Sequence, residues 1–437
     1  MITGPPAGPL AIDLELPMTQ AATLTPTAPR PAHVPDALVY DFDMFADPAL
    51  LVDPHQRILD LVRNAPPVFW TPRNGGHWML LSHAANFNAS RDTESFSSEF
   101  ISPEKMKALR AMMPPGSPHI PQAIPINLDP PEHGKYRGPL QRVFSPKAMA
   151  LLTDDIRALA RDLILKVKDN GRCEFMTEIA ELLPVQVFLK MLGLPLERQA
   201  EYRALVRDHL ADSNLDPRKM IMKLQRVAAN MRDTMLERRD NPRDDILSLL
   251  WKLEIDGKPT TLEDMENYGV LLFIAGLDTV MNGMGHGARH LARDQALQQE
   301  LRRDPTRVGD ATEELLRRYT FTVPPRFVGK DIVFDGVAMK KGEKVMLYLP
   351  AADLDAKEYP DPDRFDLQRE GKPHIAFNAG PHRCLGSHLA RLELQVLYEE
   401  MLALLPAFRL DPQHPPRFHG GHVVGVDTLH LVWDAQV

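Results

Sequence analysis

One cysteine set between glycines, just ahead of an amphipathic run, most constrains what this chain can fold into. Residues 377–386 read FNAGPHRCLG, and helical periodicity follows over residues 387–404. A helix that begins beside Cys384 places free backbone N–H groups and a positive dipole end near the sulfur, which favours the thiolate. Gly380 and Gly386 allow a sharp turn or the close approach of a flat ligand. The stretch therefore predicts one thiolate presented to a buried metal.

Composition and length limit the kinds of protein that this chain can be. The 437 residues contain no Gly/Ser linker, repeat or long charge run, so we expect one large domain over residues 35–437 after a flexible N-terminal tail over residues 1–34. The two cysteines, Cys173 and Cys384, argue against a disulfide framework and fit a reducing cytoplasm. The net charge of −8 argues against a nucleic-acid partner. The most apolar stretch, residues 270–277, is too short to cross a bilayer, and we expect a soluble protein.

Helical periodicity dominates the rest of the chain. It predicts helices over residues 103–112, 145–168, 176–192, 197–211, 217–239, 262–293 and 306–319. A turn enters a short strand at residues 75–81, alternation typical of strands covers residues 328–349, and Asp256-Gly257 predicts a hairpin turn. The expected fold class is mainly α with a small β-sheet region.

The pattern F-x-x-G-x-H-x-C-x-G resembles the haem-binding loop of the cytochrome P-450 superfamily. The resemblance implies a triangular helical prism that encloses haem b, with Cys384 as the axial thiolate ligand of the iron. A thiolate ligand favours O–O cleavage over reversible oxygen storage, so the implied activity is that of a monooxygenase with O2 as co-substrate. A buried, inert cysteine is the alternative.

Residues 275–279 read AGLDT, near the middle of the expected helix 262–293. A glycine there costs about 1 kcal/mol of helix propensity, and a threonine hydroxyl can disturb the backbone ladder and open a pocket. Close helix packing would also explain the small residues. The pattern resembles the superfamily's oxygen-binding groove, which implies that Asp278 and Thr279 are catalytic, Asp278 relaying protons, and that Ala275 and Gly276 lie against the haem.

The segment 129–137 reads DPPEHGKYR and predicts a helix start, with proline at its beginning and an acid in the first turn. His133 and Arg137 share a face of that helix. Haem propionates need cationic or N–H partners when partly buried. The resemblance implies that His133, Arg137, Arg326 and His382 supply them, and that Phe377 and Gly386 complete the cofactor site. The alternative is an ordinary surface His–Arg pair.

Glu314 and Arg317 lie three residues apart on one helix face. A solvated ion pair worth a few tenths of a kcal/mol would be the ordinary interpretation. In the P-450 superfamily, however, an E-x-x-R pair and an arginine from a proline-rich segment lock the cysteine loop. The resemblance implies that Glu314, Arg317 and Arg364 form this structural core.

The likeness narrows to the soluble bacterial class of camphor 5-monooxygenase, through motifs such as NGGHW at 74–78, GLDTV at 276–280 and LVWD at 431–434. Pro121 stands where that class has the tyrosine that holds the camphor ketone, and no tyrosine lies between Tyr40 and Tyr136. The lost hydrogen bond is worth about 1 kcal/mol. We therefore expect a small hydrophobic substrate, terpenoid or norisoprenoid-like and not camphor. The expected contacts are Ile126, Leu271, Ile274, Thr322, Val423 and Val424.

The chain carries no flavin or iron–sulfur domain pattern, so the resemblance implies electrons from a [2Fe-2S] ferredoxin fed by an NADH-dependent ferredoxin reductase. Five basic residues could form a docking patch for an acidic ferredoxin: Lys135, Arg142, Lys372, Arg383 and Arg391. Three alternatives to the monooxygenase remain open: a peroxide-driven haem-thiolate enzyme, a non-catalytic haem protein that binds a ligand, and a haem-free helical protein.

Overall fold

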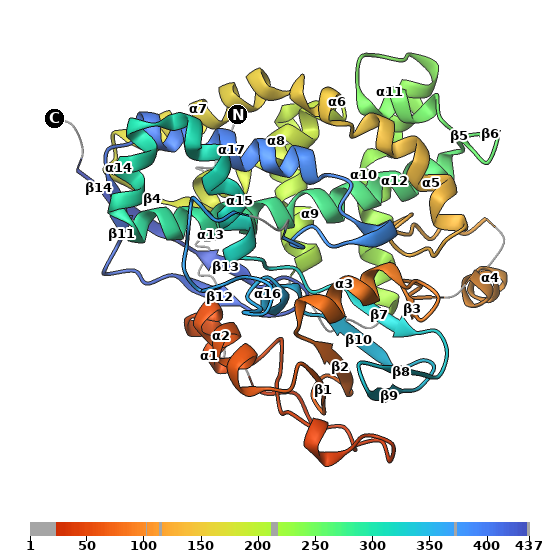
Figure 1. Ribbon diagram of the computed structural model, residues 1–437. Helices are drawn as coiled ribbons and strands as arrows, with labels where there is room; N and C mark the ends of the chain where they lie inside the picture. The colour runs from red at the N-terminus through yellow and green to blue at the C-terminus, as the bar shows by residue number, and fades with distance from the viewer. Residues whose placement is uncertain (1–22, 102, 113–115, 211–216, 371–373, 435–437) are drawn as a thin grey trace, which may run out of the picture.

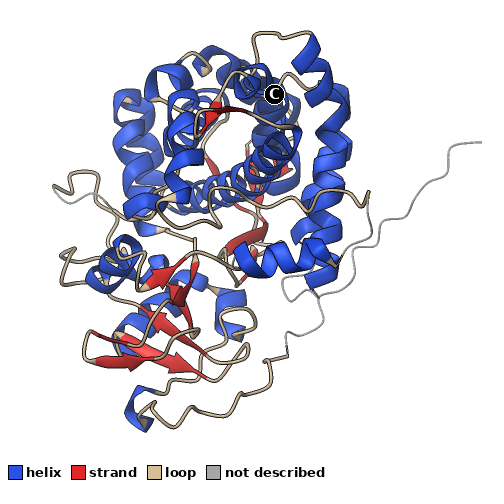
Figure 2. Cartoon of the chain, turned by 90° about the vertical axis from the view of Figure 1, so that its right-hand side faces the viewer, coloured by secondary structure: helices blue, strands red, loops and turns tan. Residues whose placement is uncertain are grey.

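The computed structural model describes residues 23–101, 103–112, 116–210, 217–370 and 374–434, and shows a mainly helical protein with several small sheets (Figure 1). In the view turned by 90°, most helices lie in the upper part of the molecule and a β-rich part lies below them (Figure 2). The expected class, mainly α with a small β-sheet region, is confirmed.

The largest sheet joins strands from both halves of the chain in the order β1-β2-β10-β7-β3. Its strands are β1 (Val68–Thr71), β2 (His77–Leu80), β3 (Phe96–Ser97), β7 (Pro325–Val328) and β10 (Lys344–Leu347). Strand β10 pairs parallel with β2, and the other pairs are antiparallel. The sheet fixes β7 in place, and β7 carries Arg326 to the central cavity.

The remaining strands form small sheets, and the expected hairpin at Asp256-Gly257 is confirmed. They are β4 (Arg172–Glu174), β5 (Glu254–Ile255), β6 (Lys258–Pro259), β8 (Ile332–Phe334), β9 (Val337–Met339), β11 (Phe408–Leu410), β12 (Arg417–His419), β13 (Gly425–Thr428) and β14 (His430–Trp433). The β12–β13 hairpin, close to the C-terminus, also reaches the central cavity.

Eleven α-helices lie in the described part of the chain before α12. They are α1 (Pro48–Val52), α2 (Pro54–Asn64), α3 (His83–Arg91), α4 (Pro103–Ala111), α5 (Glu132–Val143), α6 (Pro146–Ala150), α7 (Thr153–Lys168), α8 (Leu182–Met191), α9 (Gln199–Leu210), α10 (Pro217–Asp240) and α11 (Ile246–Trp251). Two predicted helices are interrupted: residues 145–168 divide into α6 and α7, and residues 176–192 begin as a π-helical turn, η2 (Met176–Ala180), before α8. Periodicity continues across such breaks and does not reveal them.

The predicted central helix 262–293 divides into α12 (Leu262–Gly276) and α13 (Asp278–Arg293), with Leu277 between them. A capping box of Thr261 and Asp264 begins α12. Together the two helices are long and apolar enough to span a membrane, but 72% of the relevant window is buried inside the protein. They are therefore the core helix pair of the fold, and the glycine-rich stretch after Leu277 allows close packing.

The C-terminal half contributes α14 (Gln295–Arg303), α15 (Val308–Arg318), α16 (Leu349–Ala352) and α17 (Ser387–Leu404), with short 3-10 turns at Asp36–Leu38, Leu196–Arg198, Pro305–Arg307 and Gly380–His382. Helix α17 packs with α7, α13 and α15 around one large apolar cluster, which places the N-terminus of α17 at the centre of the molecule. The predicted helix over residues 387–404 is confirmed at both ends.

The predicted tail is too long at its C-terminal end. Residues 1–22 lie outside the described part of the chain, but Val34 is fully buried in an apolar cluster. The backbone N–H and the hydroxyl of Thr25 also bind the Asp43 carboxylate at 2.8 and 2.9 Å. The segment from residue 25 onward therefore packs on the domain. Its Pro-rich composition suggested a flexible tail, whereas contacts with the β1–β2 hairpin hold it in place.

Candidate active site

A cavity of about 1230 Å³ lies within the fold, and nearly every predicted site residue lines it. The predicted catalytic, cofactor and substrate residues that do so are Ile126, His133, Arg137, Leu271, Ile274, Ala275, Gly276, Asp278, Thr279, Thr322, Arg326, Phe377, His382, Cys384, Gly386 and Val423. Val424 is a correction. Its side chain is buried in an apolar cluster with Phe42 and Leu50, because neighbouring extended residues point to opposite sides and Val423 faces the cavity.

The cysteine loop is held by its own backbone and by α3. The Cys384 N–H donates to the Phe377 carbonyl at 2.8 Å, and the Gly386 N–H binds the sulfur. Gly380 has φ +67°, and a Cβ there would overlap the Ser90 carbonyl at the end of α3. Gly386 has an ordinary φ of −81° and open space where a Cβ would lie. The backbone therefore does not require glycine here, and the missing side chain only leaves the cavity wider.

The electrostatics of Cys384 differ from the expectation. Burial raises the pKa of the thiol, and the Gly386 N–H and the guanidinium groups of Arg137, Arg391 and Arg383 only partly offset this effect. The helix N-terminus alone therefore does not hold the sulfur as an anion, because removing a thiolate from water outweighs the nearby positive charge. A bound metal ion would deprotonate it.

Four basic side chains converge on one part of the cavity wall. The His133 and His382 rings lie 4.4 Å apart, and the buried Nε2 atom of each has no hydrogen-bond partner, nor has Arg137 Nε. Burial lowers the pKa of His133 to about 4, of His382 to about 3 and of Arg326 to about 10. Unpartnered buried donors are costly, so this cluster fits the carboxylates of an anionic ligand.

The wall beside the cysteine fits a flat cofactor. Ala275 and Gly276 face the cavity, and a Cβ added at Gly276 would meet open space. The Phe377 ring lies under the Arg391 guanidinium, 4.5 Å from its centroid, and Arg391 is paired with Glu313. A cavity-facing cysteine, small residues and an unpartnered basic cluster together fit haem b. When bound, haem with a thiolate ligand supplies the activation of O2.

The predicted oxygen groove lies where α12 gives way to α13. The Thr279 hydroxyl donates to the Ala275 carbonyl at 2.8 Å, which is the local disturbance expected from the sequence. Asp278 is 8% exposed, and its Oδ1 accepts a hydrogen bond from Asn282 Nδ2 at 2.9 Å. Burial raises the pKa of the Asp278 carboxyl. A carboxyl of this kind can hold and release a proton near the cavity.

Aromatic residues in the cavity wall were missed by the sequence reasoning. Phe45, Phe100 and Phe327 line this cavity, and none of them was among the expected contacts. The Phe100 and Phe327 rings lie 5.9 Å apart. They come from a loop and from β7, which meet only in the folded sheet, so no local pattern could reveal them.

The structural lock around Glu314 is confirmed in part. Arg317 binds both Glu314 carboxylate oxygens, at 2.7 and 2.8 Å. The third arginine is Arg369: its Nε donates to Glu314 Oε1 at 3.0 Å, whereas Arg364 is exposed and contributes only its carbonyl. The prediction of the Arg364 side chain is wrong, because a turn at Asp361, with φ +46°, directs Arg364 outward.

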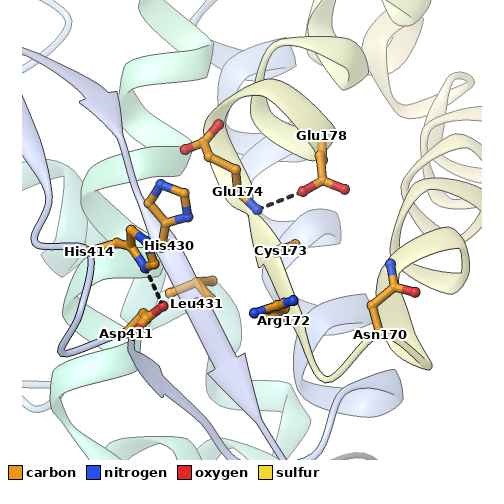
Figure 3. A pocket seen from close by; sticks show the side chains of 9 residues that line it. All are labelled: Asn170, Arg172, Cys173, Glu174, Glu178, Asp411, His414, His430 and Leu431. Carbon is orange, nitrogen blue, oxygen red and sulfur yellow. Dashed lines mark hydrogen bonds and ion pairs between the residues drawn. The ribbon is translucent and has the colours of Figure 1, made fainter.

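A second, polar pocket of about 610 Å³ is lined by residues of the paired strands β4 and β14 (Figure 3). Its carboxylates are already used: Glu174 accepts from the backbone N–H groups of Met176 and Thr177, and Asp411 binds His414 at 2.7 Å. Among the described residues, no group of three or more His, Cys, Asp or Glu side chains is placed to hold a metal ion.

Comparisons with known proteins agree with this geometry. The family model described as "Cytochrome P450" matches residues 203–426. "Probable cytochrome P450 127A1" from Sinorhizobium fredii is 35% identical and is covered over 97% of its length by 93% of this chain. The crystal structure of CYP101J2 superimposes with a TM-score of 0.82 at 33% identity, and that of CYP101C1 with 0.83 at 31%; each covers 93% of this chain and is itself wholly covered. The chain thus belongs to the cytochrome P450 family and is a haem-thiolate monooxygenase.

Proposed function

We propose that this P450 hydroxylates a small hydrophobic compound of terpenoid or norisoprenoid type, with electrons delivered by a separate [2Fe-2S] ferredoxin. The observation that carries the substrate class is the wall of the cavity away from the cysteine. It is built almost entirely from aliphatic and aromatic side chains: Phe100, Ile126, Leu271, Ile274, Phe327 and Val423. Such a surface favours an apolar ligand.

Thr322 supplies a polar contact in this wall. Its hydroxyl lies 3.5 Å from the Ala376 carbonyl, at the outer limit of a hydrogen bond, and is therefore available to a ligand. A ligand carbonyl could accept from it, with a contribution of about 1 kcal/mol. The substrate class is thus an apolar skeleton with at most one or two oxygen atoms.

Asp278 and Thr279 have the proposed catalytic roles. The Asp278 carboxyl is buried at the cavity, and burial raises its pKa, so that it can hold a proton one residue before Thr279. Oxygen activation consumes protons, and a positioned carboxyl supplies them faster than bulk water does. Replacing Asp278 by Asn should slow product formation by about 10²-fold or more.

A binding titration tests the substrate class. Limonene, β-ionone, camphor and progesterone should be titrated against the holoenzyme, with the spin-state change of the haem as readout. We expect limonene or β-ionone to bind best. Camphor binding as tightly as the best of them would refute the terpenoid assignment as stated, and progesterone binding best would move it to steroids.

The Thr322→Val variant provides an internal control. The variant should raise the Kd of β-ionone, which carries a ketone, about fivefold, in line with the loss of about 1 kcal/mol of binding free energy. Binding of limonene, which has no acceptor, should not change. Equal losses for both ligands would mean that Thr322 shapes the wall and does not bind the ketone.

Fewer of the five predicted basic residues are available to bind a ferredoxin than the sequence suggested. Lys135 is paired with Glu132 at 2.7 Å and Arg391 with Glu313 at 2.5 Å, while Lys372 lies outside the described residues. Arg142 and Arg383 remain exposed on the cysteine side. We expect Arg383→Glu to slow reduction by a [2Fe-2S] ferredoxin in stopped flow, strongly at low salt. Arg63→Glu, on α2, is the control. If Arg383→Glu and Arg63→Glu are reduced at the same rate, Arg383 does not belong to a ferredoxin-docking surface.

Product formation with peroxide alone distinguishes the electron source. If peroxide supports turnover as well as ferredoxin, reductase and NADH do, the ferredoxin part of the proposal fails while the substrate assignment stands. A cytoplasmic location belongs to the same proposal. It is supported by the two unpaired cysteines, Cys173 and Cys384.

A further inference from the structure

A histidine–aspartate pair on the C-terminal hairpin lies at the edge of the active-site cavity. His419 ends β12 and Asp427 lies in β13, and His419 Nδ1 is 2.6 Å from Asp427 Oδ1. Both line the cavity, and their side chains are 38% and 41% exposed. The cofactor cluster and the apolar substrate wall leave this pair without a function.

The ring of His419 reaches inward over a glycine. His419 and Gly425 are opposite each other in the hairpin register. A Cβ on Gly425 would overlap the Cε1 and Nε2 atoms of the ring and would lie 2.6 Å from Asn282 Oδ1. The Nε2 edge of His419 and the Asn282 carboxamide therefore crowd the same point above Gly425, and only glycine leaves room for both.

Asn282 connects this point to the catalytic carboxyl. Its Oδ1 accepts from the Val426 N–H at 2.8 Å, and its Nδ2 donates to Asp278 Oδ1 at 2.9 Å. Asn282 is fully buried. Asp427, His419, Asn282 and Asp278 therefore follow one another from the half-exposed edge of the cavity to the buried carboxyl, with the His419 ring and the Asn282 carboxamide both close to Gly425.

The charges along this line act on one another. His419 lowers the pKa of Asp278 and Asp427 raises it, while burial is the largest cause of its upward shift. Asp427 and Asp278 both raise the pKa of His419 against the opposing effect of burial. The charged groups that act most on Asp278 are thus His419 and Asp427 of the hairpin, and His419 also lowers the pKa of His286 on α13.

We propose that His419, held by Asp427, is the point at which solvent protons enter the path to Asp278. The Nδ1–H of His419 is fixed on Asp427, so Nε2 is the atom that takes up a proton from water and passes it, directly or through one water, to the Asp278 carboxylate. His419 returns to the neutral form, and Asp278 then gives the proton up inside the cavity. Insertion of one oxygen atom of O2 into a C–H bond with release of water consumes two protons and two electrons, and this path supplies the protons.

The proposal rests on the catalytic role proposed for Asp278, and the experiment separates the two. His419→Gln keeps the size and polarity of the side chain but cannot carry a proton. Its matched control is His414→Gln, which alters another His–Asp pair, with Asp411 at 2.7 Å, in the polar pocket; neither residue of this pair lines the active-site cavity (Figure 3). With β-ionone as probe, we expect product formed per NADH consumed to fall about tenfold in His419→Gln. This is less than the ~10²–10⁴ of a lost general acid, because water replaces part of the path.

Two further measurements report on the mechanism. The carboxyl band of Asp278, assigned by infrared difference against Asp278→Asn, should titrate at higher pH in His419→Gln, because the variant lacks the cation that stabilises the carboxylate. In Asp427→Asn the pKa of His419 falls, so activity, which needs the protonated imidazole, should be lost at a lower pH than in the parent. The Kd of β-ionone should stay unchanged, and the melting temperature should fall by no more than it does in His414→Gln.

The outcomes are distinguishable. If Asp278→Asn slows turnover and His419→Gln behaves like His414→Gln in coupling and in the Asp278 titration, the His419 path is wrong and the role of Asp278 stands. If Asp278→Asn has no effect, the proposed catalytic role itself fails. A tenfold loss in His419→Gln that coincides with weaker β-ionone binding would assign His419 to substrate positioning and overturn the proton path.

Discussion

Replacing Arg369 should destabilise this P450, whereas replacing Arg364 should not. The Arg369 side chain makes four hydrogen bonds: to Glu314 Oε1 at 3.0 Å and to the carbonyls of Pro360, Asp361 and Arg364 at 2.7, 3.1 and 2.9 Å. It thereby ties the proline-rich segment to the buried Glu314.

The expected loss of stability depends on which hydrogen bonds of Glu314 remain when the Arg369 side chain is removed. Removing one partner of a buried ion pair costs about 3–5 kcal/mol when the other charge is left alone. Glu314 keeps both bonds to Arg317, and water can reach the three carbonyls, so we expect about 2–3 kcal/mol for Arg369→Ala. Unfolding entropy of about 2.1 cal per mole per kelvin per residue gives about 0.9 kcal/mol per kelvin over 437 residues. The melting temperature should therefore fall by about 3 °C.

The assay is thermal unfolding of the holoenzyme, followed by circular dichroism and by the haem absorbance together. Arg364→Ala, an exposed change, should stay within about 0.5 kcal/mol of the parent and thus within 1 °C. Arg369→Lys should recover only part of the loss, because an ammonium cannot reproduce the fork. Equal shifts for Arg364→Ala and Arg369→Ala, or the reverse order, would refute the reasoning.

Three other predictions concern stability. Gly287→Ala should cost about 1–3 kcal/mol, because its Cβ would overlap a buried tyrosine hydroxyl, whereas Gly138→Ala, with open space above it, should be neutral or stabilising in urea titrations. Burial raises the pKa of Glu393 to about 8, so stability should fall as pH rises from about 4.5 to 8, and Glu393→Gln should abolish that fall in melting temperature. Burial lowers the pKa of His286 and His290 to about 4. Because these histidines take up protons below about pH 6.5 in the unfolded chain, the free energy of unfolding should fall between about pH 6.5 and 4. Replacing both by Gln should flatten the dependence of that free energy on pH.

Local chemistry made part of this structure predictable from the sequence. Helix α17 was predicted at both ends because amphipathic periodicity and the glycine before it act within a few residues. The cysteine loop and the Asp278-Thr279 step were predicted through contiguous motifs, and the structure brings them to one cavity.

Tertiary geometry decided the parts that could not be predicted. Whether Arg364 or Arg369 reaches Glu314 depends on the path of the chain after Asp361, which has a positive φ, and the proline-rich sequence does not reveal that path. The pairing of His419 with Asp427 depends on hairpin register, which shifts between Arg417 and Phe418. A shift of one residue turns side chains to the other face, so no spacing rule could assign this pair to the cavity.

The basic cluster of the cofactor site should make haem a part of the protein's stability. His133 Nε2, His382 Nε2 and Arg137 Nε are buried without hydrogen-bond partners among the described residues, and each such group costs about 1–3 kcal/mol until an acceptor binds it. Haem propionates, once bound, would satisfy these groups, and that gain would be available only in the folded state. Hydrogen exchange of protein with and without haem should therefore show protection gained at the start of α5 and over residues 380–386, while α7 and the sheet β11-β14-β4, which carry none of the cluster's residues, exchange alike in both forms. Protection gained uniformly over the whole chain, or none at α5, would mean that the basic cluster does not couple the cofactor to the fold.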